Sequence, residues 1–322
     1  MDLATIKSHI GNEFISLEEE IQKRVETEVD LINTLSKHIL SGGGKRLRPT
    51  VLLLANKACE KESKKCIGAS VVVEFIHAAT LLHDDVVDES KVRHGKKTVN
   101  DIWGNQGAVL VGDFLYSRAF EIIVEINNPR VYESLAYTTN IISQGEVLQL
   151  INLHNPDMNE ETYMDIIFKK TAKLFETSAE IGSILAGDNK VNSSSLSEFG
   201  LHFGLAYQLR NDFLDYFGSE EITGKNLAED LTEGKPTLPL IYAIKVAKDS
   251  ERKLIQNNII KNNLKEIDDI LQILKRNNVK EYLQNKINLE TTSAIKSLER
   301  MKDNVCKDSL IQLANYCAER DK

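Results

Sequence analysis

The sequence predicts an all-α protein on three observations. Most of the 322 residues have helical periodicity or a helix-forming composition, persuasive strand alternation is absent, and only five prolines occur, so that long uninterrupted helices are feasible. The expected helices cover residues 13–39, 50–60, 68–88, 107–125, 131–151, 160–186, 195–217, 237–249, 264–276, 278–301 and 308–319.

Turn signals separate these helices. They fall at 42–44, around Gly95, at 127–129, at 155–156 and in 218–235. The sequence contains no linker-like stretch, low-complexity tract or repeat period, and its 42% hydrophobic content is enough for one large core. We therefore expect residues 1–322 to form a single domain.

Charge and composition narrow the class of protein. With 40 basic and 48 acidic residues the net charge is −8, which argues against general nucleic-acid binding. The four cysteines show no CxxC spacing and no signal peptide is evident, so we expect a cytoplasmic protein with reduced thiols. The longest apolar run, from Gly68 to Leu82, is expected to be too short, and too polar at Glu74 and His77, to span a bilayer.

Three carboxylates, Asp84, Asp85 and Asp88, end the helix expected at 68–88. Asp84 and Asp88 are four residues apart and share a helical face, where two unpaired carboxylates repel each other. A divalent cation removes this conflict, and oxygen ligands of this kind suit magnesium. The alternative is a helix end with solvated acids, and the nearly all-apolar helix in front weighs against it.

A second acidic motif occurs downstream at Asn211, Asp212 and Asp215, again with its oxygen ligands on one helical face. Cationic segments accompany the two motifs, at 41–49, 93–97, 169–171 and 224–235. Glycines allow close backbone approach to an anion, and Lys and Arg supply charge, so the pattern indicates a diphosphate site with metal. The stretch GGGKRLRP lacks the GxxxxGK[ST] spacing of a nucleotide-binding P-loop.

Several motifs in one order resemble the trans-isoprenyl diphosphate synthases, the polyprenyl synthetase family. They are GGKRLRP, LLHDDVVDES followed by RxG, GDFLYSRAF, GEVLQL, a KT pair, QLRNDFLD and EDLTEGKPTLPLI, and they extend from about Gly42 to Ile241. The resemblance implies an isoprenoid synthase type antiparallel helical bundle around a deep central cavity, and a homodimer. It also implies condensation of isopentenyl diphosphate with an allylic diphosphate, and a lipid product that brings the protein to the membrane surface.

The resemblance also assigns roles to individual residues. Two to three Mg²⁺ ions would be held by Asp84, Asp88, Asn211, Asp212 and Asp215. The catalytic set would comprise Asp84, Asp85, Asp88, Lys170, Thr171, Gln208, Asp212 and Lys225. The substrates would contact Lys45, Arg48, His77, Arg93, His94, Lys170, Thr171, Gln208, Lys225 and Lys235.

Two positions depart from the family pattern. His94 stands where a second arginine is usual, which removes one guanidinium from the isopentenyl diphosphate site. Asn211 stands where an aspartate is usual, and its carboxamide brings an oxygen ligand without charge. Neither change affects the first acidic motif.

Small side chains in front of the first motif predict a long product. Ala79 and Thr80 precede Asp84 by about 6 to 7.5 Å of helix, where the growing chain must pass. In the family a bulky aromatic at this level stops growth, whereas here the tunnel would stay open past Ile76, with Leu135 as the expected floor. We therefore expect a long-chain all-trans product, about octaprenyl, for quinone side chains.

Other functions remain open at this point. A geranylgeranyl or farnesyl diphosphate synthase would share every motif. A class I terpene cyclase would not need the isopentenyl diphosphate loop with Lys45 and Arg48. A non-catalytic regulatory subunit of a heteromeric synthase is favoured by His94 and Asn211, but opposed by the intact set of acids and cations.

Overall fold

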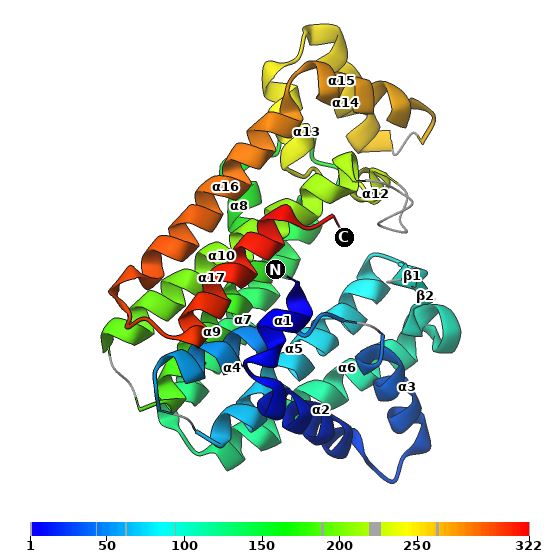
Figure 1. Cartoon of the computed structure of the whole chain (residues 1–322). Helices are drawn as coiled ribbons and strands as arrows, with labels where there is room; N and C mark the ends of the chain where they lie inside the picture. Colours follow the sequence, from blue (N-terminus) through cyan, green and yellow to red (C-terminus); the bar gives the residue numbers. More distant parts are fainter. Residues whose placement is uncertain are drawn as a thin grey trace. The chain divides into compact units, whose positions relative to one another are not determined.

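A computed structural model describes residues 2–42, 44–61, 63–93, 95–187, 190–218, 227–261 and 264–321 (Figure 1). It confirms the all-α prediction, because the described residues contain only one pair of two-residue strands, β1 (Val92–Arg93) and β2 (Lys96–Lys97). The first helices are α1 (Leu3–Ser8), α2 (Gly11–Val25), α3 (Asp30–Leu40), α4 (Leu47–Ala58), α5 (Lys65–Val87), α6 (Val99–Ile126) and α7 (Pro129–Ile151).

The chain continues with α8 (Glu160–Ile167), the π-helical turn η1 (Phe168–Ala172), α9 (Lys173–Leu185) and α10 (Lys190–Phe217). The remaining elements are α12 (Glu229–Thr232), α13 (Leu238–Val246), α14 (Asp249–Lys261), η2 (Leu264–Glu266), α15 (Ile267–Arg276), α16 (Val279–Ser297), η3 (Leu298–Arg300) and α17 (Val305–Glu319).

The contacts divide the chain into two compact units, each made of three segments. Unit 1 comprises Met1–Thr139, Thr177–Ser197 and Leu298–Leu313, and unit 2 comprises Asn140–Glu176, Glu198–Ser297 and Ala314–Lys322. The expectation of a single domain remains a prediction. Each unit carries one of the two acidic motifs, and the two are described separately.

Unit 1 is built around α5, which packs against α6, α4 and α2 (Figure 1). Its side chains are buried on nearly every face, including Val71, Val72, Phe75 and Ile76. Helix α5 is longer than the apolar run in the sequence. It has 23 residues, and an 18-residue window within it has a mean hydropathy of 1.6, so it could cross a membrane by length and composition alone. Because 67% of this window is buried within the protein, it is better explained as a core helix.

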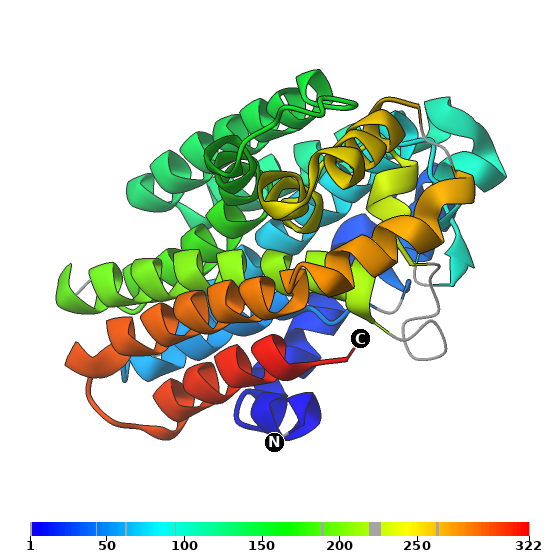
Figure 2. The ribbon, with the colours of Figure 1, turned by 90° about the horizontal axis from the view of Figure 1, so that it is seen from above.

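In unit 2, helix α13 lies among α14, α15, α16 and α8 (Figure 2). Apolar side chains from these helices and from α10 form one continuous core cluster. Burial of this surface holds α10, which carries the second acidic motif, against α8, which begins at the cap formed by the Asn159 side chain on the Thr162 amide.

Three local predictions were wrong. The helix expected at 13–39 is divided into α2 and α3, and the Asn33 side chain stabilises the break by bonding both the amide and the carbonyl of Thr27. Helix α14 was missed because its sequence is mostly polar. The helix expected at 160–186 contains the π-helical turn η1, and a single wide turn changes too little of the periodicity to be recognised.

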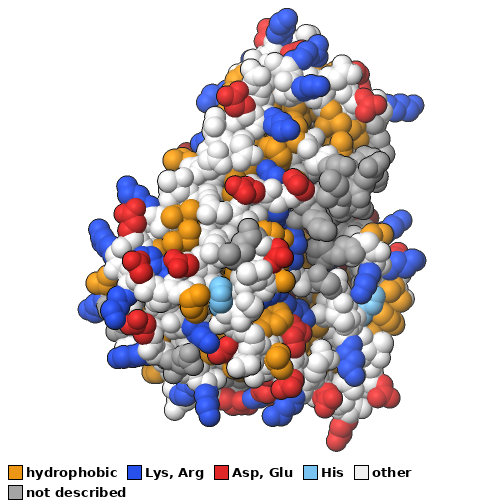
Figure 3. Space-filling model, viewed as in Figure 1, with side chains coloured by type: hydrophobic (Ala, Val, Ile, Leu, Met, Phe, Trp, Pro, Cys, Tyr) orange, Lys and Arg blue, Asp and Glu red, His pale blue; other side chains and the backbone are white. Residues whose placement is uncertain are grey.

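Figure 3 shows Lys and Arg side chains interspersed with Asp and Glu on the face that it displays. This distribution agrees with the acidic net charge of −8 and gives this face no extended basic patch.

Candidate active site

The first acidic motif lies at the end of α5 in unit 1. Asp84 and Asp88 are partly buried, and Asp88 caps the helix with its amide bonded to the Asp84 carbonyl at 2.8 Å. Asp85 points inward, is 1% exposed and accepts hydrogen bonds from Arg93, with Nη2 at 2.7 Å from Oδ1. Burial raises the pKa of Asp85, and the Arg93 guanidinium opposes that shift.

Asp85 therefore anchors the loop after the first motif. Arg93, expected to hold a diphosphate, is bonded to Asp85 in this structure, and the Asn100 amide bonds the carbonyls of Asp85 and Ser90. The strand pair formed by Val92–Arg93 and Lys96–Lys97 turns at Gly95, whose φ of 74° favours glycine. His94 lies outside the described residues.

The expected isopentenyl diphosphate residues of unit 1 sit next to a buried ion pair. Arg46 donates to Glu74 on α5 at 2.5 Å and to Glu18 on α2 at 3.0 Å. Lys45 and Arg48 lie on either side of Arg46 in the sequence, and the carbonyl of Lys45 accepts from the Lys7 ammonium at 2.8 Å. The pair thus fixes the loop before α4 against α5, which also carries His77.

The expected chain-length residues of α5 and α7 are all in unit 1. Ala79 is 0% exposed, Ile76 is 1% exposed and Leu135 is 1% exposed, so all three side chains are buried in the interior of the unit. Thr80 is partly buried, and its hydroxyl donates to the His77 carbonyl at 2.8 Å. The role of these four residues in product length remains a prediction.

In unit 2, the π-helical turn η1 presents Lys170 and Thr171. Helix α7 approaches this turn closely at Gly145, where a Cβ atom would lie 2.7 Å from Lys169 Cβ and 3.0 Å from Lys170 Cγ. The next residue, Glu146, pairs with Lys170 at 2.5 Å, while Lys169 pairs with Asp165. The wide turn places Lys170 beside Glu146, and π-helical turns are frequent at functional sites.

The second acidic motif extends along α10. The two carboxylate oxygens of Asp212 accept hydrogen bonds from the Tyr163 hydroxyl at 2.5 Å and from the Gln208 amide at 2.7 Å. The Gln208 carbonyl oxygen accepts from the Thr171 hydroxyl at 3.1 Å. Three predicted site residues, Thr171, Gln208 and Asp212, are thus connected in one hydrogen-bond chain.

Asp215 stabilises the beginning of α12 by hydrogen bonds. Its two oxygens accept from the backbone amides of Glu229 and Asp230, at 3.0 and 3.2 Å, as a helix N-cap does. Lys235, three residues beyond α12, pairs with Glu233 at 2.7 Å. Lys225 lies outside the described residues.

Asn211 is engaged by the carboxyl-terminal segment. Arg320 donates to the Asn211 carboxamide oxygen and lies over the Tyr207 ring at 4.5 Å, and it is only 8% exposed. In return Arg210 donates to the carbonyl of Arg320 at 2.6 and 2.8 Å. The carboxamide oxygen expected to bind metal therefore already accepts a charged hydrogen bond.

Burial and neighbouring charge disfavour the ionised form of the acids in the second motif. Burial, followed by repulsion from Asp230, raises the pKa of Asp212 to about 8 and that of Asp215 to about 9. Among the described residues, no group of three or more His, Cys, Asp or Glu side chains is arranged to hold a metal ion. Magnesium needs few protein carboxylates and takes its other ligands from water and phosphate, so this all-oxygen donor set fits it.

Several residues that support the candidate site could not be identified from the sequence. Glu74 was a detectable signal, since one charge in an apolar run needs a buried partner, but nothing local points to Arg46 as that partner. Tyr163 and Arg320 gave no signal, because their partners are 49 and 109 residues away.

Comparison with known proteins shows which family the chain resembles. The polyprenyl synthetase family model matches residues 29–276. Octaprenyl diphosphate synthase of Escherichia coli (strain K12) is 39% identical over 323 residues, covering 100% of both chains. The all-trans-nonaprenyl-diphosphate synthase (geranyl-diphosphate specific) of Rhodobacter capsulatus is 38% identical over 316 residues, covering 98% of this chain and 97% of its own.

Two solved structures are similar throughout. The polyprenyl synthase from Caulobacter crescentus CB15, complexed with calcium and isoprenyl diphosphate, has a TM-score of 0.96 and 34% identity, with 100% of this chain and 98% of that chain covered. A decaprenyl diphosphate synthase from Rhodobacter capsulatus has a TM-score of 0.94 and 33% identity, with 100% of both chains covered.

The helical fold and these similarities define an enzyme of the trans-prenyltransferase class, with the all-α isoprenoid synthase fold. The chain belongs to the polyprenyl synthetase family.

Proposed function

We propose that this enzyme condenses isopentenyl diphosphate with an allylic diphosphate, repeatedly, to give a long-chain all-trans polyprenyl diphosphate of about octaprenyl length. The observation that carries the proposal is the second acidic motif, where Gln208 links the buried Asp212 to Thr171 of the π-helical turn that also presents Lys170. Acids and cations held together in this way suit a metal diphosphate. Full-length similarity to octaprenyl and nonaprenyl synthases supports the product class.

The site residues would have separate roles in binding metal and diphosphate. Asp84, Asp88, Asp212 and Asp215 would hold two to three Mg²⁺ ions, which supply charge that stabilises the departing pyrophosphate. Lys170, Lys225 and Lys235 would bind the allylic diphosphate. Arg93 would join them only by sharing its hydrogen bonds with Asp85.

Lys45, Arg48 and His77 would bind isopentenyl diphosphate, and the Arg46–Glu74 pair fixes the loop with Lys45 against α5, which carries His77. Ionisation of the allylic carbon–oxygen bond gives a delocalised cation, the isopentenyl double bond attacks it, and loss of a proton restores an allylic product. The hydroxyl of Thr171 and the carboxamide of Gln208 are oriented by their mutual hydrogen bond, and their dipoles would stabilise the cation.

A second part of the proposal is a homodimer formed through α6. This helix exposes a row of large apolar side chains, with Leu110 67%, Phe120 51% and Val124 71% exposed. Large apolar side chains exposed on one side of a helix, here together with the exposed Asp113, are typical of an interaction surface. Light scattering during size-exclusion chromatography should give twice the chain mass of 36.2 kDa, and Phe120→Glu should reduce it to the monomer mass.

Heteromeric assembly is the second candidate. Asn211 replaces an expected acid and bonds Arg320, and component 2 of the heptaprenyl diphosphate synthase of Geobacillus stearothermophilus is 34% identical over 244 residues. Under this alternative the purified chain alone would be inactive. The proposed enzyme should be active without a partner.

Asp84→Ala tests the proposed site. Loss of this ligand should lower turnover of the purified enzyme by at least about 100-fold. Asp84 is partly exposed, so the melting temperature should stay near that of the wild type. Asp303→Ala, at an exposed acid of the same unit away from α5 and α6, should keep full turnover. Equal turnover of Asp84→Ala and wild type in chelator-washed protein with added Mg²⁺ would disprove the assignment.

A further inference from the structure

Tyr163 brings a phenol hydroxyl to the carboxylate of Asp212. Its oxygen lies 2.5 Å from Asp212 Oδ2, and both residues are 2% exposed. The phenol hydroxyl is the donor and the carboxylate oxygen is the acceptor. The contact joins α8 to α10 within unit 2.

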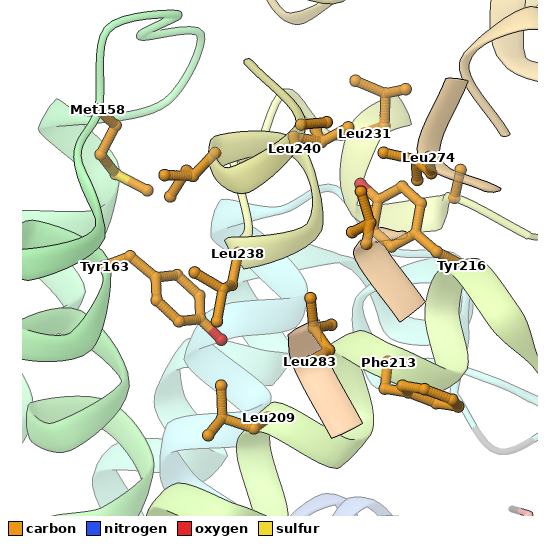
Figure 4. Close-up of a cluster of buried hydrophobic side chains, with 14 of the residues drawn as sticks. Met158, Tyr163, Leu209, Phe213, Tyr216, Leu231, Leu238, Leu240, Leu274 and Leu283 are labelled. Carbon is orange, nitrogen blue, oxygen red and sulfur yellow. The ribbon is translucent and has the colours of Figure 1, made fainter. Parts of the chain in front are cut away.

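The ring of Tyr163 belongs to the apolar core cluster of unit 2. Figure 4 shows its ring beside Leu238, with the hydroxyl directed toward the helix that carries Leu209. Phenylalanine would fill this space equally well, and a buried hydroxyl is costly unless it forms a hydrogen bond. The hydroxyl therefore does more than fill space, and its hydrogen-bond partner is Asp212.

The second oxygen of Asp212 is fixed in the same way. Gln208 donates to Oδ1 at 2.7 Å, and Gln208 is itself oriented by Thr171. A carboxylate offers about four acceptor positions, so these two bonds restrain its rotation and leave acceptor capacity on each oxygen. A carboxylate restrained by such hydrogen bonds is a better metal ligand, since it loses less freedom on binding.

We propose that Tyr163 is a positioning residue that holds the Asp212 carboxylate in the orientation needed for a divalent cation. The inference rests on the proposed function of the second acidic motif. It adds a residue of α8 that no sequence motif identifies, and it predicts that removal of one hydroxyl oxygen weakens metal use without harming the fold.

Tyr163→Phe tests this role. The concentration of Mg²⁺ that gives half-maximal turnover should rise at least about tenfold, as for loss of other groups that orient metal ligands. Turnover at saturating Mg²⁺ and the KM for isopentenyl diphosphate should stay close to wild type. Calorimetric titration of Mg²⁺ into protein with inorganic pyrophosphate should show the same loss of affinity without any turnover.

Tyr282→Phe is the matched control. Tyr282 donates to Glu160 at 2.7 Å in the same unit, so this variant also loses a bond from a tyrosine to a carboxylate. Its Mg²⁺ dependence should equal that of the wild type. Equal Mg²⁺ dependence in all three proteins, equal weakening in both variants, or a Tyr163→Phe protein that fails to fold would overturn the proposal.

The two proposals fail in different ways. If the wild-type enzyme makes no polyprenyl product, the proposed function is wrong, but the calorimetric comparison still decides the role of Tyr163. If the wild type is active and Tyr163→Phe binds Mg²⁺ with wild-type affinity, only the positioning role is wrong.

Discussion

Lys170 Nζ lies 2.5 Å from Glu146 Oε2, so a cation expected to bind the allylic diphosphate is already paired with a carboxylate. The lysine side chain is 16% exposed and the glutamate 31%, which makes the pair reachable from solvent. Under the proposed function a diphosphate would compete with Glu146 for Lys170, since both are anions that accept from the same ammonium group. Glu146 would then set part of the free-energy cost of substrate binding.

Glu146→Gln should lower the KM for the allylic diphosphate by about threefold, which matches the modest strength of partly exposed ion pairs. The amide keeps a hydrogen bond to Lys170 but removes the competing charge. Glu176→Gln is the control, because Glu176 pairs with Lys173 at 3.0 Å, outside the proposed site. A KM that is unchanged or higher in Glu146→Gln would show that Glu146 does not compete with substrate.

Gly204→Ala should disturb the π-helical turn. A Cβ atom at this position of α10 would lie 2.5 Å from Ala172 Cα and 2.9 Å from Ala172 Cβ, so the turn that carries Lys170 and Thr171 must move. We expect the free energy of unfolding to fall by about 1 to 3 kcal/mol, as for other overpacked cores, together with a loss of turnover. Denaturant unfolding and initial rates measure both quantities. Wild-type stability and turnover in this variant would refute the close approach.

His202 should make stability depend on pH. Its hydrogen bond to Glu290, 2.7 Å long, raises the pKa of His202 in the folded state above its unfolded value near 6.5. Protonated His202 therefore stabilises the fold at pH values below the unfolded pKa, and this stability is lost as the pH rises through the folded pKa. His202→Gln should cost no more than about 1 kcal/mol in mildly acidic solution and much less in alkaline solution.

Denaturant unfolding at a series of pH values measures this difference. Glu290→Gln should reproduce it, because either change removes the same pair. A stability difference between His202→Gln and wild type that stays constant with pH would contradict the assignment.

Features of the fold and site that depend on local sequence pattern could be predicted from the sequence. Helical periodicity predicted most helices, and the spacing of Asp84 and Asp88 marked the first acidic motif. Contacts between distant residues could not be predicted in this way. Tyr163 meets Asp212 and Arg320 meets Asn211 only because packing in unit 2 brings α8 and the carboxyl-terminal segment to α10. The present partners of Arg93 and Lys170 were also hidden, since a cation in a motif does not reveal which anion it binds at rest.

Product length should respond to the side chain at residue 79. Ala79→Tyr should shorten the main product to about farnesyl, because a phenol would enter the path of the growing chain about one helical turn from the first acidic motif. Leu135→Ala should lengthen the product by removing the expected floor. Chromatography of the dephosphorylated products reports both changes. Ala79→Ser is the matched control and should retain the wild-type distribution, whereas an unchanged distribution in Ala79→Tyr would show that this residue does not face the chain.

The most direct test is the product made by the purified wild-type chain alone. It would be incubated with Mg²⁺, farnesyl diphosphate and radiolabelled isopentenyl diphosphate, and the products would be separated by chain length. We expect a series that ends at about octaprenyl and that vanishes when Mg²⁺ is chelated. A main product no longer than geranylgeranyl, or no product without a second protein, would contradict the proposed long-chain synthase.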